Sequence, residues 1–230
     1  MSIIRSIIFY SLFYLGTSIY FILFSPVRIF STKFVIRLSF IWTTSVIRLA
    51  KIVLKIDYSI IGRENIPTTG PFIVASNHQS AWETFFFGSF FPGSVFILKH
   101  ELKKIPIFSQ YFKKLGFIFI KREKKINSLK NALNSIRKLL EEKKKVFVIF
   151  PEGTRLKPGE TIKLNSGVFA IHKLFKIPIL PVKLNSGEMW INKSLSKKDG
   201  DIKIRFFPVI NNQEFDVTTG DFHKYVGNFK

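Results

Sequence analysis

From Asp57 onward, short apolar runs alternate with stretches of helical periodicity, and this alternation limits the possible folds more than any other feature of the sequence. Runs rich in Phe, Ile and Val are typical of buried strands. They occupy residues 57–61, 71–76, 95–99, 117–121, 146–150, 179–184 and 202–207. Helices are expected between some of them, at about residues 80–87, 126–144 and 166–175. Strands that alternate with helices predict an α/β fold with a largely parallel sheet flanked by helices.

The first 56 residues differ from the rest of the chain. Residues 6–24 contain no charged side chain, and 19 residues of helix span about 28 Å, close to the hydrocarbon thickness of a bilayer. The residues that follow, up to Lys55, carry only basic charges, with apolar side chains at helical spacing between them. This pattern indicates a basic amphipathic helix at a membrane surface, with a core helix of a soluble fold as the alternative. We therefore expect membrane-anchoring helices over residues 1–56 and an α/β domain over residues 57–230. Whether residues 6–24 span the bilayer or lie in one leaflet stays open.

The formal net charge of +21 attracts anions, which leaves nucleic acid, an anionic membrane or an acidic carrier protein as partners. No nucleic acid is expected, because no recognised binding motif and no basic stripe with interleaved aromatics occur outside the N-terminal helices. The absence of cysteine excludes disulfides, thiolate nucleophiles and Cys-based zinc sites. The histidines, at positions 78, 100, 172 and 223, show no ligand spacing, so no metal is expected.

The first motif that carries chemistry is residues 77–83, Asn-His-Gln-Ser-Ala-Trp-Glu, directly after an expected strand. In an α/β sheet, the loop that leaves the carboxyl end of a strand is where ligands bind. A carboxylate at Glu83 can fix the tautomer of His78, whose other nitrogen then takes a proton from a hydroxyl. Positions five apart diverge by about 140° on a regular helix, so the pair meets only if the chain turns around Gln79 and Ser80. As an alternative, Ser80 and Glu83 have the spacing of a helix capping box.

The second motif is residues 150–155, Phe-Pro-Glu-Gly-Thr-Arg, which also follows an expected strand. Gly153 allows a tight turn, and the planar fork of Arg155 suits a phosphate, with Thr154 as a further donor. An ordinary loop with a solvated Arg is the alternative, and the spacing is not that of a P-loop. Both motifs follow buried strands, so we expect them at one edge of a parallel sheet. A base beside an anion site suits proton abstraction from a hydroxyl of a phosphorylated substrate.

Together, the two motifs, about seventy residues apart, resemble those of the glycerolipid acyltransferase family. Two weaker blocks, at residues 99–122 and 177–182, are similar to further blocks of that family. Within that family, the chain is similar to the bacterial lysophosphatidic acid acyltransferases. The resemblance implies transfer of a fatty acyl group to the sn-2 hydroxyl of 1-acyl-sn-glycerol-3-phosphate. The product is phosphatidic acid for phospholipid biosynthesis. The implied location is the cytoplasmic face of a bacterial inner membrane.

The resemblance also implies roles for single residues. His78 acts as general base and Glu83 orients it. The substrate phosphate is bound with the help of Glu152, Gly153, Thr154, Arg155, Lys99 and Arg122. Pro178 belongs to the acyl-donor side. No cofactor is implied beyond the co-substrate, either acyl-CoA or acyl carrier protein, and the sequence does not choose between these donors.

Other functions remain open. Within the family, another lysolipid or glycerol-3-phosphate itself can be the acceptor. A non-enzymatic basic protein that binds anionic membranes agrees with the charge alone. A hydrolase with Ser80 as nucleophile is a third hypothesis, although the Gly-x-Ser-x-Gly elbow is missing.

Overall fold

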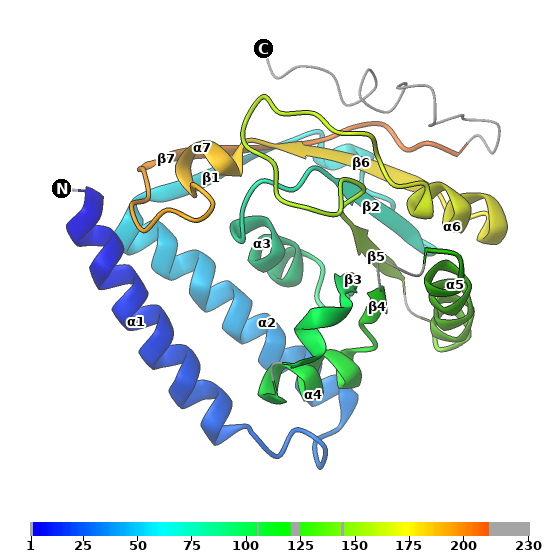
Figure 1. Ribbon diagram of the computed structural model, residues 1–230, viewed down its shortest axis with the longest axis horizontal. Helices are drawn as coiled ribbons and strands as arrows, with labels where there is room; N and C mark the ends of the chain where they lie inside the picture. The colour runs from blue at the N-terminus through cyan, green and yellow to red at the C-terminus, as the bar shows by residue number, and fades with distance from the viewer. Residues whose placement is uncertain (1, 105, 121–124, 144, 212–230) are drawn as a thin grey trace.

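The apolar runs of the sequence form seven strands of one sheet in the computed structural model, which describes residues 2–104, 106–120, 125–143 and 145–211 (Figure 1). The strands are β1 (Ile56–Ile61), β2 (Phe72–Ser76), β3 (Val95–Lys99), β4 (Ile118–Ile120), β5 (Val146–Ile149), β6 (Ile179–Leu184) and β7 (Gly200–Phe206). The longer helices are α1 (Ser2–Leu23), α2 (Thr32–Leu49), α3 (Trp82–Phe90), α4 (Pro106–Leu115), α5 (Lys125–Glu141) and α6 (Gly167–Phe175). Shorter turns are η1 (Ala50–Leu54), η2 (Arg63–Asn65), η3 (His100–Lys104) and α7 (Ser186–Met189).

The strand order across the sheet is β1-β7-β6-β2-β5-β3-β4. The strands β6, β2, β5, β3 and β4 run parallel to one another. At one side, β7 pairs antiparallel with β6 and parallel with β1, so β1 and β7 run opposite to the other five. The predicted α/β fold with a largely parallel sheet is confirmed.

Side chains of the central strand β2 alternate between two hydrophobic layers. Phe72 and Val74 belong to the layer built with α1, η1 and α3, whereas Ile73 and Ala75 face α5 and α6. All five residues of β2 are buried. A strand covered by helices on both faces reads as a continuous apolar run, which explains the sequence pattern.

The N-terminal helices pack on the sheet domain and also leave one apolar side exposed. Phe9 of α1 is fully buried, with its ring edge-to-face on Trp190 at 5.3 Å. By contrast, Leu15 and Leu23 of α1 are 62% and 67% exposed. Within the described residues, the helix Ile3–Leu23 is long and apolar enough to cross a bilayer, which weakly suggests membrane association. The boundary predicted after residue 56 does not separate the hydrophobic cores, since both segments share one.

The second N-terminal helix combines the two alternatives left by the sequence. α2 packs against α3 and buries Val35, Leu38, Thr43, Val46 and Ile47, as a core helix does. Its Phe34, Phe40 and Ile41 are exposed instead. The amphipathic pattern therefore serves the core on one side of α2, and only the other side is open to a membrane.

Among the longer helices, α4 has no counterpart in the sequence prediction. α4 contributes Tyr111 and Leu115 to a cluster with Phe21 of α1 and Leu38 of α2. The Tyr111 hydroxyl donates to the carbonyl of Phe24 at 2.9 Å. This cluster ties the α1–α2 hairpin to the region before β4.

Candidate active site

The loop between β2 and α3 brings His78 against Glu83. His78 Nδ1 lies 2.9 Å from Glu83 Oε1. The contact is possible because residues 77–81 are not helical and α3 begins only at Trp82, later than the sequence predicted. The expected turn around Gln79 and Ser80 is confirmed.

Glu83 is fully buried and collects several donors besides His78. Its Oε1 accepts from the backbone N–H groups of Gln79 and Ser80, each at 2.7 Å. Its Oε2 accepts from the hydroxyls of Ser80 and Ser186. Burial alone raises the pKa of the Glu83 carboxyl, but His78 and the two hydroxyls outweigh it and hold the pKa below its usual value. Glu83 is thus an ionised partner for His78 and also holds the turn before α3. The helix itself is capped at Ala81 without a side-chain hydrogen bond, so the capping-box alternative is not formed.

The Ser80 hydroxyl is not placed for nucleophilic attack. It is fully buried, donates to Glu83, and accepts from the Trp82 N–H at 3.0 Å. A nucleophile needs access to a substrate carbonyl and a base that takes its proton. The hydrolase hypothesis based on Ser80 therefore has no support in this geometry.

The imidazole of His78 is held on one face by Phe150. The two rings stack with centroids 4.1 Å apart and planes 17° from parallel. The side chain is 15% exposed, and no described residue forms a hydrogen bond with its Nε2. With Nδ1–H donated to Glu83, the neutral ring presents Nε2 as a proton acceptor.

The second motif wraps around the backbone of His78. Glu152 Oε2 accepts from the His78 N–H at 2.9 Å, and the Leu156 N–H donates to the His78 carbonyl at 2.9 Å. Asn165 fixes the start of this loop by donating to the Pro151 carbonyl from both its backbone and its side chain. Arg155 is exposed and directly precedes Leu156, so the loop keeps it close to the dyad. The two motifs lie at one sheet edge, as predicted.

Burial changes the ionisation of two groups near this loop. It raises the pKa of Glu152 to about 7, against the opposing effect of the His78 N–H. It also lowers the pKa of Lys197 to about 8, and the nearby positive charge of Arg155 lowers it further. The Lys197 ammonium donates to the carbonyls of Ile191 and Ser194, and so closes the turn that follows α7.

The segment after β6 completes the site, and sequence reasoning missed it. The Asn77 side chain pairs with both backbone groups of Leu184, at 2.8 and 2.9 Å. The Gly187 N–H donates to Gln79 Oε1 at 3.1 Å, an approach that a Cβ would obstruct because it would lie 2.9 Å from Gln79 Cβ. The one available signal was that residue 185 follows a strand whose carboxyl end lies at the same edge as that of β2.

The other predicted site residues do not all lie at the sheet edge that carries the dyad. Lys99 is exposed at the carboxyl end of β3, Gly153 adopts φ 66°, and Thr154 is half-buried in the same loop. Pro178 lies at the opposite edge of the sheet, where its carbonyl accepts from the N–H of Ile73 at the start of β2. The structure therefore does not bring Pro178 to the dyad. Arg122 lies outside the described residues.

The described part of the chain offers no metal site, since no three His, Asp or Glu side chains gather there as ligands. His172 is buried, and its Nδ1 lies 2.6 Å from the carbonyl of Ile177.

Comparison with known proteins gives consistent matches. Residues 57–185 match the family model described as Acyltransferase. A 1-acyl-sn-glycerol-3-phosphate acyltransferase from Pseudomonas aeruginosa is 35% identical over 218 residues, which cover 90% of this chain and 81% of that protein. Another from Saccharomyces cerevisiae is 32% identical over 142 residues, which cover 59% of this chain and 45% of the yeast protein.

The crystal structure of the 1-acyl-sn-glycerophosphate acyltransferase PlsC from Thermotoga maritima is similar with a TM-score of 0.76. The match covers 98% of this chain and 93% of that chain at 23% identity, so it shows the fold.

Proposed function

The chain belongs to the acyltransferase family, and on that premise we propose that it transfers a fatty acyl group from a thioester to the sn-2 hydroxyl of 1-acyl-sn-glycerol-3-phosphate. The placement of the His78 imidazole is the main support for this proposal. Its Nδ1 is held by an ionised, buried Glu83. Its Nε2 forms no hydrogen bond with any described residue and lies beside the loop that carries Arg155. A hydroxyl on a phosphorylated glycerol is the substrate that uses both features.

In the reaction, Glu83 keeps the proton of His78 on Nδ1 and stabilises the imidazolium that forms. Nε2 takes the proton of the sn-2 hydroxyl while the oxygen attacks the thioester carbonyl carbon. The carbon–sulfur bond then breaks, and the leaving thiolate takes the proton from the imidazolium. No acyl-enzyme forms, which agrees with the buried and engaged hydroxyl of Ser80.

For the substrate phosphate we assign Arg155, with Lys99 and the predicted Arg122 as further cations. Gly153 and Thr154 supply a backbone N–H and a hydroxyl from the same loop. Glu152 has a different part, because its carboxylate accepts from the His78 N–H and is half-buried. With a pKa of about 7, Glu152 carries less than a full negative charge near neutrality, which limits its repulsion of the phosphate.

The acceptor and the product are lipids, so the enzyme works at a membrane. We assign α1 to the bilayer because its outer side exposes Ile4, Leu15 and Ile22. The cytoplasmic face of a bacterial cell membrane is the assigned location, since acyl-CoA and acyl carrier protein are cytosolic donors. Basic residues attract anionic lipid at about 1 kcal/mol each near the surface.

The test is acyl transfer in detergent to a panel of acceptors: 1-acyl-sn-glycerol-3-phosphate, other lysolipids and glycerol-3-phosphate. Each acceptor is assayed with two acyl donors, acyl-CoA and acylated acyl carrier protein. The wild type should form phosphatidic acid, and His78→Ala should lower the rate by roughly 10²-fold to 10⁴-fold without loss of folding. A wild-type protein that acylates another acceptor best would replace the substrate in the proposal. Retention on vesicles without any acylated product would favour the non-enzymatic hypothesis.

A further inference from the structure

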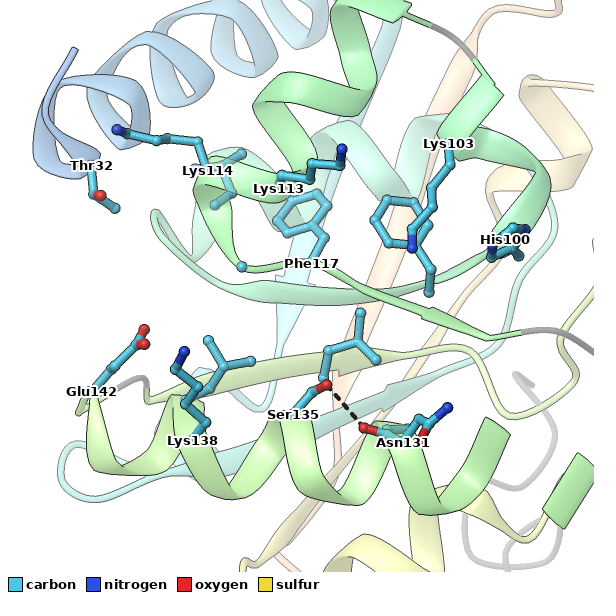
Figure 2. Close-up of a pocket in the computed structure, with 16 residues that line it drawn as sticks. Thr32, His100, Lys103, Lys113, Lys114, Phe117, Asn131, Ser135, Lys138 and Glu142 are labelled. Carbon is cyan, nitrogen blue, oxygen red and sulfur yellow. Dashed lines mark hydrogen bonds between the residues drawn. The ribbon is translucent and has the colours of Figure 1, made fainter. Parts of the chain in front are cut away.

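A groove of about 790 Å³ lies apart from the dyad, along the edge strand β4 (Figure 2). One wall is formed by α4 and β4, and the other by one face of α5. The buried side chains of Leu115, Ile118, Ala132 and Leu139 form its apolar floor. The sheet order places β4 at the outer side, so this groove is open to the surroundings rather than to the core.

The rim of the groove is basic. Lys103, Lys113, Lys114 and Lys138 line it, against a single carboxylate, Glu142. Among the described residues, none of these lysines forms an ion pair. Lys103 lies over the ring of Phe119 at 4.9 Å, and Lys114 donates to the Arg28 carbonyl at 3.3 Å. The groove therefore presents four lysine ammonium groups against one carboxylate, and no described residue holds any of the four in an ion pair.

The dimensions of the groove suit a helix of a partner protein. Asn131, Ser135, Lys138 and Glu142 follow one another along the same face of α5 (Figure 2). From Asn131 to Glu142 the helix rises through eleven steps, which is about 16 Å or three turns. An apolar floor between charged walls is the form of a helix-in-groove site. The lysines are spread along this length, whereas a small anionic donor concentrates its phosphates in one place.

The groove also ends close to the proposed chemistry. Its His100 end follows the carboxyl end of β3, at the same sheet edge as His78. Between β2 and β3 lies only β5, so the two strand ends are separated by about 10 Å at the usual strand spacing. A partner seated in the groove can thus present a thioester on a flexible arm to the dyad.

We propose that this groove docks an acidic carrier protein that delivers the acyl thioester. The inference rests on the proposed function and deepens it, because it chooses the protein-bound donor over acyl-CoA. Charge complementarity selects an acidic partner, and the concave shape excludes a flat bilayer surface. Electrostatic steering of this kind raises the association rate and is weakened by salt.

The experiment compares the same acyl chain on acyl carrier protein and on coenzyme A. The groove variant is Lys113→Glu with Lys138→Glu, and the matched control is Lys173→Glu with Lys203→Glu. The latter two lysines are exposed on α6 and β7, outside the groove, so both pairs make the same charge change. We expect the groove pair to lose roughly tenfold or more in kcat/KM with the carrier protein, through KM. With acyl-CoA, it should stay within about twofold of wild type, as should the control pair with both donors.

Salt supplies a second readout: added NaCl should reduce the wild-type rate with the carrier protein more steeply than that of the groove pair. Equal losses with both donors, or equal losses in the control pair, would overturn the docking site. A wild type that uses only acyl-CoA would overturn it too, while the proposed function would stand. If the wild type transfers from neither donor, the proposed function is wrong. In that case, binding of the carrier protein can still be measured through the fluorescence anisotropy of a labelled sample. Loss of binding in the groove pair alone would support the docking site.

Discussion

Ser186 donates a hydrogen bond from its hydroxyl to Glu83 Oε2 at 2.6 Å, across 103 positions of the sequence. The contact joins the end of β6 to the start of α3, and both side chains are fully buried. It completes the set of donors that keeps Glu83 ionised. The orientation of His78 therefore depends on a residue that follows a different strand of the sheet.

We expect Ser186→Ala to lower kcat by about tenfold while KM for the lysolipid stays nearly unchanged, because one hydrogen bond to a charged group is lost. A carboxylate with fewer donors ionises less readily, so the acidic limb of the pH–rate profile should move to higher pH. The profile of kcat against pH measures both effects. Ser89→Ala is the control, since that hydroxyl donates to the Phe86 carbonyl within α3 and leaves the dyad alone. An unshifted acidic limb in Ser186→Ala would speak against the role of the hydroxyl.

Glu152 should make the folded state less stable as the pH rises. Its pKa is about 7 in the folded protein against the ordinary 4.5, so the folded state binds more protons between these values. The stability it contributes is complete below pH 4.5 and is lost as the pH rises through 7, by about 3 kcal/mol at most. Glu152→Gln keeps an acceptor for the His78 N–H but does not ionise. Urea unfolding at pH 5 and pH 8 should show a smaller decrease in the variant, and equal decreases would contradict the assignment.

Arg155→Lys should raise KM for 1-acyl-sn-glycerol-3-phosphate by about tenfold, although the positive charge is kept. A guanidinium contacts a phosphate through two parallel donors, whereas an ammonium acts as a point charge. Initial rates over a range of lysolipid concentrations separate KM from kcat. Lys157→Ala serves as control, being exposed two positions further along. Equal KM values for Arg155→Lys and wild type would remove Arg155 from the phosphate site.

Two residues of α1 should separate folding from membrane binding. Phe9→Ala removes a fully buried ring and should lower the free energy of unfolding by about 3–5 kcal/mol. Leu15 is 62% exposed, so Leu15→Ala should leave stability in detergent nearly unchanged and weaken binding to vesicles. Thermal unfolding and vesicle flotation provide the two measurements. If Phe9→Ala were without effect on stability, the helix would be an appendage rather than part of the core.

Sequence reasoning found the strands because burial on both faces leaves continuous apolar runs, such as that of β2. It also identified His78 and Glu83, which lie in one short loop. It missed Ser186 because that contact depends on which strand neighbours β2, and periodicity does not encode strand order. The prediction started α3 too early, at Ser80, because serine is a common N-cap residue. In the structure Ser80 lies in a turn, and the helix begins at Trp82. The assignment of Pro178 came from resemblance alone, and its place at the other sheet edge follows from the direction of β6.

The reversed direction of β1 and β7 places the N-terminal helices at the sheet edge that carries His78. Because β1 runs opposite to β2, its first residue, Ile56, lies at the edge where β2 ends. The hairpin of α1 and α2 thus enters the sheet there, and Ser6 of α1 accepts from the Lys197 N–H near the same edge. With α1 in the bilayer, as proposed above, a lysolipid moving laterally in the membrane would arrive at the catalytic loops without crossing the aqueous phase. Turnover should accordingly follow the mole fraction of acceptor in the membrane rather than its bulk concentration.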